Sequence, residues 1–135
     1  MLVQFGTIAW REEEDGAVRI LLITSRETRR WVVPRGNAMP RLGAAGSAAE
    51  EAYEEAGIRG AISEQPLGSY RYDKRRKNGA LVPAEVRLYA LRVLEELDEW
   101  PERDQRERRW FAPAEAAEAV DEPDLKELLR SFRAG

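Results

Sequence analysis

Two runs of apolar and β-branched residues open the chain, at residues 3–10 (VQFGTIAW) and 18–24 (VRILLIT), with a polar turn between them. This pattern predicts two strands joined as a hairpin. Residues 30–34 (RWVVP) predict a third short strand, which Pro34 ends. Residues 35–46 hold three glycines and a proline without periodicity, so they are expected to form a loop.

A helix of about ten residues is expected next, because residues 47–57 combine alanine and glutamate between two end signals. Ser47 is a candidate N-cap, and Glu50 three residues later completes a capping-box pattern. Gly57 stands where a C-terminal glycine is expected. The alanines at 48, 49, 52 and 56 share the side that would pack closely on a sheet.

The second half of the chain predicts a longer hairpin and two more helices. Asn78-Gly79 separates two strand-forming runs, and residues 86–93 carry apolar groups on both faces, as a central strand covered on both sides does. Residues 108–111 (RRWF) predict a last strand. Pro113 and Pro123 are expected to open two helices, the second with an apolar stripe of Leu125, Leu128, Leu129 and Phe132. Together these elements predict an α/β (α+β) fold with a mixed β-sheet between helices.

Composition narrows the class of protein. The chain has 135 residues, 43% of them hydrophobic, which fits one domain over residues 1–135. Its net charge of −3 gives no reason to expect a nucleic acid polymer or a membrane as partner. The N-terminus lacks the apolar stretch of a signal peptide, so a cytoplasmic location is expected. With no cysteine and no histidine, thiol and serine–histidine chemistry and the usual zinc ligands are excluded.

Four glutamates stand within six positions of the predicted helix, at 50, 51, 54 and 55. Glu51, Glu54 and Glu55 fall within about one third of the helix circumference. Such a face is usually solvated, but like charges four residues apart repel each other, and no lysine is interleaved. A divalent cation that prefers oxygen ligands, Mg²⁺ or Mn²⁺, would relieve this repulsion. The pattern therefore favours a metal site.

Residues 36–58 (GNAMPRLGAAGSAAEEAYEEAGI) resemble the Nudix box, G-x5-E-x7-R-E-U-x-E-E-x-G-U, where U is a bulky apolar residue. The matching positions are Gly36, Glu51, Glu54, Glu55, Gly57 and Ile58. The flanking segments are similar to the diphosphoinositol polyphosphate phosphohydrolase branch of this superfamily, and the similarity continues to RRWFAPAEA. The resemblance implies a Nudix α/β/α sandwich that hydrolyses a diphosphate with Mg²⁺ or Mn²⁺.

The resemblance also implies roles for individual residues. Glu51 and Glu55 would be metal ligands, Glu54 a ligand or the base that activates water, and the carbonyl of Gly36 would complete the coordination. Glu51 and Glu54 are thus the catalytic candidates. Two box positions depart from the pattern: Leu42 stands in place of a glutamate and Glu50 in place of an arginine. Either metal binding is altered, or a nearby arginine, such as Arg35 or Arg41, substitutes for the missing one.

Basic residues gather before the helix and around the Asn78-Gly79 hairpin, where arginine forks would suit phosphate oxygens. The family resemblance implies phosphate contacts for Thr24 and Arg26, and Arg35, Lys74 and Arg76 are the further candidates for substrate binding. The predicted function is a pyrophosphohydrolase of a phosphate-rich small molecule, either a diphosphoinositol polyphosphate or a dinucleoside polyphosphate. The alternatives are a Nudix-like sensor that binds a nucleotide or polyphosphate with weak or no catalysis, and a plain scaffold. The sequence leaves both a monomer and a homodimer open.

Overall fold

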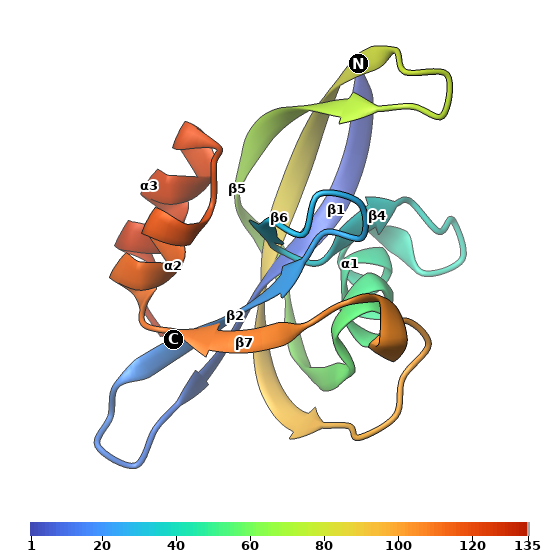
Figure 1. Cartoon of the computed structure of the whole chain (residues 1–135). Helices are drawn as coiled ribbons and strands as arrows, with labels where there is room; N and C mark the ends of the chain where they lie inside the picture. Colours follow the sequence, from blue (N-terminus) through green and yellow to red (C-terminus); the bar gives the residue numbers. More distant parts are fainter. Residues whose placement is uncertain (135) are drawn as a thin grey trace.

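A seven-stranded mixed sheet forms the centre of the molecule in the computed structural model, which describes residues 1–134 (Figure 1). The main strand order is β3-β2-β1-β6-β5, with β4 added beside β1 and β7 beside β2. β1 and β6 run parallel, and every other pair is antiparallel. The strands are β1 (Leu2–Glu12), β2 (Val18–Thr24), β3 (Trp31–Val32), β4 (Arg35–Asn37), β5 (Ile58–Arg75), β6 (Leu81–Glu96) and β7 (Arg108–Phe111).

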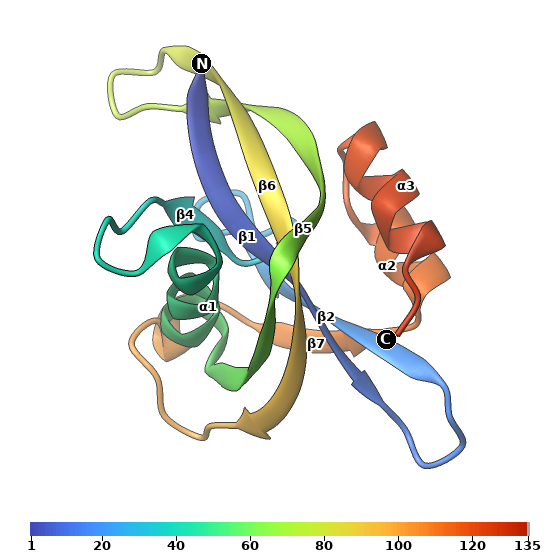
Figure 2. The ribbon, with the colours of Figure 1, turned by 180° about the vertical axis from the view of Figure 1, so that it is seen from behind.

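Helices cover both faces of this sheet, as the two opposite views in Figures 1 and 2 show. Helix α1 (Gly43–Ala56) lies on one face, and helices α2 (Pro113–Ala119) and α3 (Pro123–Ser131) lie together on the other. The apolar stripe predicted for α3 is confirmed, since Leu125 and Leu129 are fully buried and Phe132 nearly so. No helix within residues 1–134 is long and apolar enough to cross a membrane.

Two hydrophobic cores form because strand side chains alternate between the faces of the sheet. On β1, Ile8 packs toward α2 and α3, whereas its neighbour Ala9 packs toward α1. Strand β6 alternates in the same way: Val86 and Leu88 join the first core, and Leu91 joins the second. The predicted two-sided central strand is therefore confirmed, and the fold is the predicted α/β/α sandwich.

The loop predicted over residues 35–46 is wrong at both ends. Residues 35–37 form the short strand β4, which pairs with β1 through Phe5 and Gly36. At the other end, α1 begins at Gly43, four positions before Ser47. Tertiary packing extends the helix, since Ala45 and Ala48 are buried against Tyr89 of β6. These are contacts that a local pattern does not contain.

The predicted capping box at Ser47 is also wrong, because Ser47 lies inside α1. Its hydroxyl oxygen accepts a hydrogen bond from the Met39 backbone N–H at 2.7 Å and lies 2.6 Å from the Gly43 carbonyl. The actual N-cap, Leu42, makes no side-chain hydrogen bond. Ser47 therefore ties the preceding loop to the helix rather than starting the helix. The predicted C-terminal glycine is confirmed, with Gly57 in the left-handed region at φ 67°.

Candidate functional site

Helix α1 places the carboxyl group of Glu55 in the interior of the molecule. Glu55 is only 7% exposed, although the sequence gives no sign that it differs from its neighbours. One carboxyl oxygen accepts a hydrogen bond from the backbone N–H of Arg35 at 3.2 Å, and the other lies 3.6 Å from the guanidinium of Arg106. These two partners compensate in part for the removal of the carboxylate from water.

Glu51 lies one helical turn before Glu55 and reaches across to strand β4. Its carboxyl group contacts Gly36 so closely that a Cβ atom at this position would overlap the Glu51 carboxyl carbon. Position 36 therefore requires glycine because the Glu51 carboxyl group comes so close to it, and not because of its backbone angles. The carboxyl groups of Glu51 and Glu55 are themselves in hydrogen-bonding contact. The structure thus brings together Gly36, Glu51 and Glu55, as the box resemblance implies.

The contact between the two carboxyl groups changes their protonation. Burial raises the pKa of Glu55 well above the ordinary glutamate value, and the positive charge of Arg106 opposes this only in part. Burial also raises the pKa of Glu51. The charge of Glu51 raises the pKa of Glu55 further, because two carboxylates held close together repel each other.

Glu54 has both Glu50 and Glu51 as charged neighbours. Its pKa is raised by burial and by the charge of Glu51, and its carboxyl group is in hydrogen-bonding contact with Glu50. Glu50 and Glu54 line a separate surface hollow of about 400 Å³, together with Met39, Pro40, Arg41 and Leu42. Arg41 is therefore near Glu50 and Glu54.

The donor chemistry of this helix fits a divalent cation such as Mg²⁺ or Mn²⁺. Carboxylate oxygens are the ligands these ions prefer, and a cation beside Glu51 and Glu55 would favour the ionised form of both. As the side chains stand, residues 1–134 contain no group of three or more acidic side chains placed to hold a metal ion. Glu54 belongs to the same helical face but is in hydrogen-bonding contact with Glu50.

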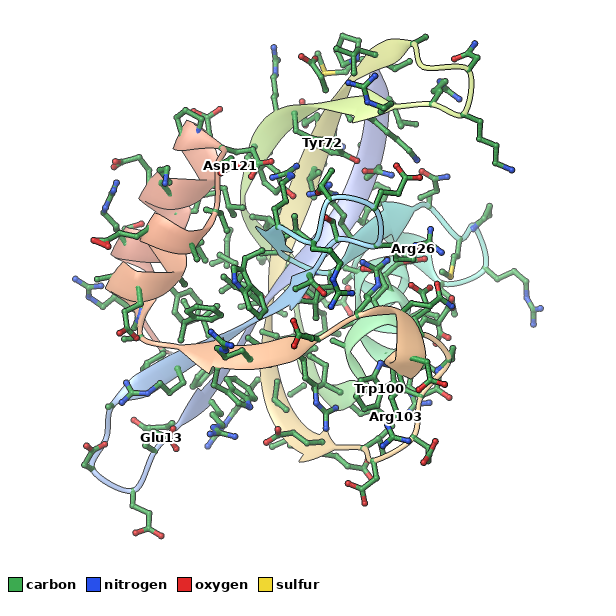
Figure 3. All side chains as sticks on the ribbon, in the orientation of Figure 1. Glu13, Arg26, Tyr72, Trp100, Arg103 and Asp121 are labelled. Atoms are coloured by element: carbon green, nitrogen blue, oxygen red, sulfur yellow. The ribbon has the colours of Figure 1, made fainter. Side chains whose placement is uncertain are left out.

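A basic pocket of about 340 Å³ opens beside Glu55. It lies between the β2–β3 loop, strand β4, the start of the β5–β6 hairpin and the segment before β7. Figure 3 labels two of its residues, Arg26 of the β2–β3 loop and Tyr72 of strand β5. The cationic lining residues are Arg26, Arg30, Arg35, Lys74, Arg75 and Arg106. Although the chain is acidic overall, this pocket concentrates positive charge next to the carboxyl pair.

Arg35 is held firmly on the pocket wall by two tyrosines of β5. Its guanidinium donates a hydrogen bond to the Tyr70 hydroxyl at 2.7 Å and lies 3.8 Å from the centre of the Tyr72 ring. Tyr70 is fully buried, and burial raises its pKa to about 12, so it remains a neutral hydroxyl. Tyr72 is fixed in turn by donating to the side chain of Gln4 at 2.6 Å. The guanidinium is therefore preorganised for an anion.

The other predicted substrate residues divide into two groups. Arg26, Arg35 and Lys74 line the basic pocket together. Thr24 does not line it: the residue is 2% exposed, and its hydroxyl accepts a hydrogen bond from the Glu107 backbone N–H. Arg76 lies at the exposed tip of the β5–β6 hairpin, where its backbone bonds to Ala80 and Gly79 close the turn.

Arg106 is the site residue that sequence reasoning missed. It stands in the acidic connection before β7, among several other arginines of the segment 103–109, and no spacing marks it out. Only the fold shows that this arginine is buried beside Glu55, whereas Arg103, three positions earlier, is exposed. Tyr72 likewise forms part of the pocket wall.

Comparison with known proteins gives one family match that spans most of the chain. The NUDIX domain family model matches residues 3–132. Among curated proteins, the chain is 33% identical over 129 residues to Nudix hydrolase 12, mitochondrial, of Arabidopsis thaliana, covering 89% of this chain and 64% of that protein. The chain thus spans somewhat less than two thirds of that relative's length.

Two further matches are a curated human protein and a solved structure. The chain is 31% identical over 132 residues to human diphosphoinositol polyphosphate phosphohydrolase 3-beta, covering 95% of this chain and 76% of that protein. Among solved structures, a binary complex of the C. elegans Ap4A hydrolase superposes with a TM-score of 0.69 at 22% identity, over 96% of this chain and 93% of that one. At this identity the structural likeness supports the fold alone.

Proposed function

The chain belongs to the NUDIX domain family, and on this premise we propose that it is a metal-dependent pyrophosphohydrolase of a phosphate-rich small molecule. One observation carries the proposal: the buried carboxyl group of Glu55, which has Glu51 as its neighbour, lies at the wall of a pocket lined by six cationic side chains. A carboxylate pair that suits a divalent cation beside groups that suit phosphate is what diphosphate hydrolysis requires.

The substrate is proposed to carry several phosphates, because the pocket lining holds six cationic side chains against three acidic ones, Glu27, Glu55 and Asp73. Three separate segments contribute cationic side chains to the pocket, namely Arg26, Arg35 and Lys74. Two of the similar proteins are named after phosphate-rich substrates, a diphosphoinositol polyphosphate phosphohydrolase and an Ap4A hydrolase. Both substrate types, a diphosphoinositol polyphosphate and a dinucleoside polyphosphate, therefore belong in the first activity screen.

The chain's own residues divide the work. Arg26, Arg35 and Lys74 bind and orient the phosphate groups, while Gly36, Glu51 and Glu55 would hold Mg²⁺ or Mn²⁺. The bound cation supplies neutralisation of phosphate charge and activation of water. Glu54, on the same helical face, is the group proposed to accept the proton of the attacking water. Its carboxyl pKa, already raised by burial and by Glu51, suits a general base better than an ordinary glutamate does.

The test is hydrolysis of both substrate types with Mg²⁺ or Mn²⁺, followed by phosphate release. Glu54→Gln and Glu55→Gln are each expected to lower kcat by at least about 100-fold, because each removes a carboxylate from the reacting centre. Glu14→Gln, at the exposed tip of the β1–β2 turn, is the matched control and should leave kcat unchanged. Unchanged turnover in both site variants would refute the mechanism.

Substrate binding is tested with Lys74→Gln and Arg76→Gln. Each variant removes one positive charge from the β5–β6 hairpin. Lys74→Gln is expected to raise KM by about tenfold, since a charge-assisted hydrogen bond contributes roughly 1.5–3 kcal/mol. Arg76→Gln should change KM less than twofold, because its side chain lies outside the pocket. Tight binding without metal and without product in the wild-type protein would favour the sensor over the hydrolase.

A further inference from the structure

We propose that Arg106 is the positioning residue for Glu55 and fills the role of the arginine that is missing at position 50. The inference rests on the proposed function, because it concerns how the carboxyl pair of that site is held. Its basis is the placement of one buried guanidinium, which joins helix α1, strand β2 and the segment before β7.

The guanidinium of Arg106 is almost completely removed from solvent, with a side chain only 8% exposed. Its Nε donates to the Glu102 carboxylate at 2.8 Å, and Nη1 donates to the carbonyl of Thr24 at 3.2 Å. The remaining nitrogen, Nη2, lies 3.6 Å from the Glu55 carboxylate. Arg106 thus has two strong anchors that fix its direction, and the free end of the fork points at Glu55.

Both anchors belong to rigid parts of the site. Thr24 ends strand β2, and its hydroxyl binds the backbone N–H of Glu107 at 2.9 Å, next in the chain to Arg106. The backbone N–H of Glu102 donates to the carbonyl of Glu54 at 3.0 Å, so this segment is bonded directly to α1. A shift of Arg106 would therefore require the strand end, the segment and the helix to move together.

The other candidate arginines do not reach the Glu55 carboxylate with their side chains. Arg35 offers only its backbone N–H to Glu55, and its guanidinium is committed to Tyr70 and Tyr72. Arg41 lines the hollow on the side of Glu50 and Glu54. Within residues 1–134, the ion pair with Arg106 is the one that Glu55 forms, and Glu50, Glu51 and Glu54 form none. The site tolerates Glu50 because its balancing cation comes from a different part of the chain.

The experiment compares Arg106→Gln, Arg106→Lys and the control Arg103→Gln in the full chain. Arg103 belongs to the same segment, but it is half exposed and pairs only with Glu99. Two quantities are measured: Mn²⁺ affinity without substrate, by electron paramagnetic resonance of free Mn²⁺, and kcat and KM with substrate. Thermal melts establish that each variant is folded.

A positioning role predicts at least about tenfold weaker Mn²⁺ binding in Arg106→Gln, as is usual when an outer partner of a metal ligand is lost. It also predicts a comparable fall in kcat with KM changed less than threefold. Arg106→Lys should recover part of both losses, because it keeps the charge without the fork, and Arg103→Gln should match the wild type. If Arg106→Gln fails to fold, Arg106→Lys tests the inference alone. Its Mn²⁺ affinity and kcat should both lie below the wild-type values.

Two results would overturn the inference. Unchanged Mn²⁺ affinity in both Arg106 variants would show that Arg106 does not hold Glu55. A rise in KM alone would make Arg106 a phosphate contact instead. Failure of the proposed function looks different: the wild-type protein would release no phosphate from any substrate, while the Mn²⁺ affinities would still rank the variants.

Discussion

At the scale of single residues, the two departures from the box meet in one place. Leu42 and Glu50 both line the surface hollow over helix α1, next to Glu54. Where the box has an acidic and a basic residue, this chain has an exposed leucine and a carboxylate in hydrogen-bonding contact with Glu54. The two departures therefore lie together at the hollow beside Glu54, away from the ion pair of Glu55 and Arg106.

The stability of the metal-free protein should depend on the protonation of Glu55. Because burial raises the folded-state pKa of Glu55 above its unfolded value, the stabilising contribution is complete below the unfolded pKa and is lost as pH rises through the folded pKa. Thermal melts in EDTA should thus show falling Tm from about pH 4.5 upward. Glu55→Gln should flatten this trend, and an equally steep trend in the variant would contradict the assignment.

At the scale of elements, the segment between β6 and β7 completes the C-terminal end of α1. The last carbonyls of a helix lack partners within the helix. Here Trp100 donates its indole N–H to the Glu55 carbonyl at 3.2 Å, and Arg108 donates to the carbonyls of Ala56 and Gly57 at 2.9 and 3.2 Å. The same segment carries Arg106, so the helix end and the carboxylate it presents are held by one piece of chain (Figure 3).

Gly57→Ala tests this junction, with Gly16→Ala as its matched control. Both glycines have positive φ, 67° and 86°, so alanine costs about 1–2 kcal/mol at either position. At Gly16 an added Cβ meets nothing within 4 Å, whereas at Gly57 it overlaps the Trp100 ring. Denaturant titration should show Gly57→Ala to be less stable than Gly16→Ala by roughly another 1–3 kcal/mol. Equal losses of stability in the two variants would mean that the packing of Trp100 against Gly57 contributes nothing.

At the scale of the whole molecule, one sheet serves two cores. Ile58 belongs to the core under α1, and Leu129 belongs to the core under α2 and α3. Alternate side chains of β1, β2 and β6 enter both, so neither core is complete without the strands of the other. We propose on this ground that residues 1–135 form a single domain that unfolds as one unit.

Ile58→Ala and Leu129→Ala should therefore shift the same unfolding transition. Each removes a fully buried side chain and is expected to cost about 2–5 kcal/mol. Differential scanning calorimetry should show one transition in the wild type and in both variants, moved to lower temperature. A second transition in either variant, with one part still melting at the wild-type temperature, would show that the two sides of the sheet unfold separately.

The local part of the structure followed from sequence. The hairpin of β1 and β2, the Asn78-Gly79 hairpin, the two-sided strand β6 and the three helices all rest on periodicity and turn chemistry, which act over a few residues. The Nudix box likewise located Gly36, Glu51 and Glu55, because residues on one helical face have a fixed relation. The errors lay where distant contacts decide: β4 needs β1 as its partner, and α1 begins early because Ala45 packs on β6.

The sequence by itself thus determined the family, the order of elements and the acidic face of α1, since these depend on neighbours along the chain. Only the tertiary structure decided which charges meet. It buried Glu55, placed Glu50 and Glu54 at a separate hollow, separated Lys74 from Arg76, and brought Arg106 to Glu55 across 51 positions of sequence. The physical reason is that the free energy of a charge depends on its burial and its partners, and both are set by chain segments far away in sequence.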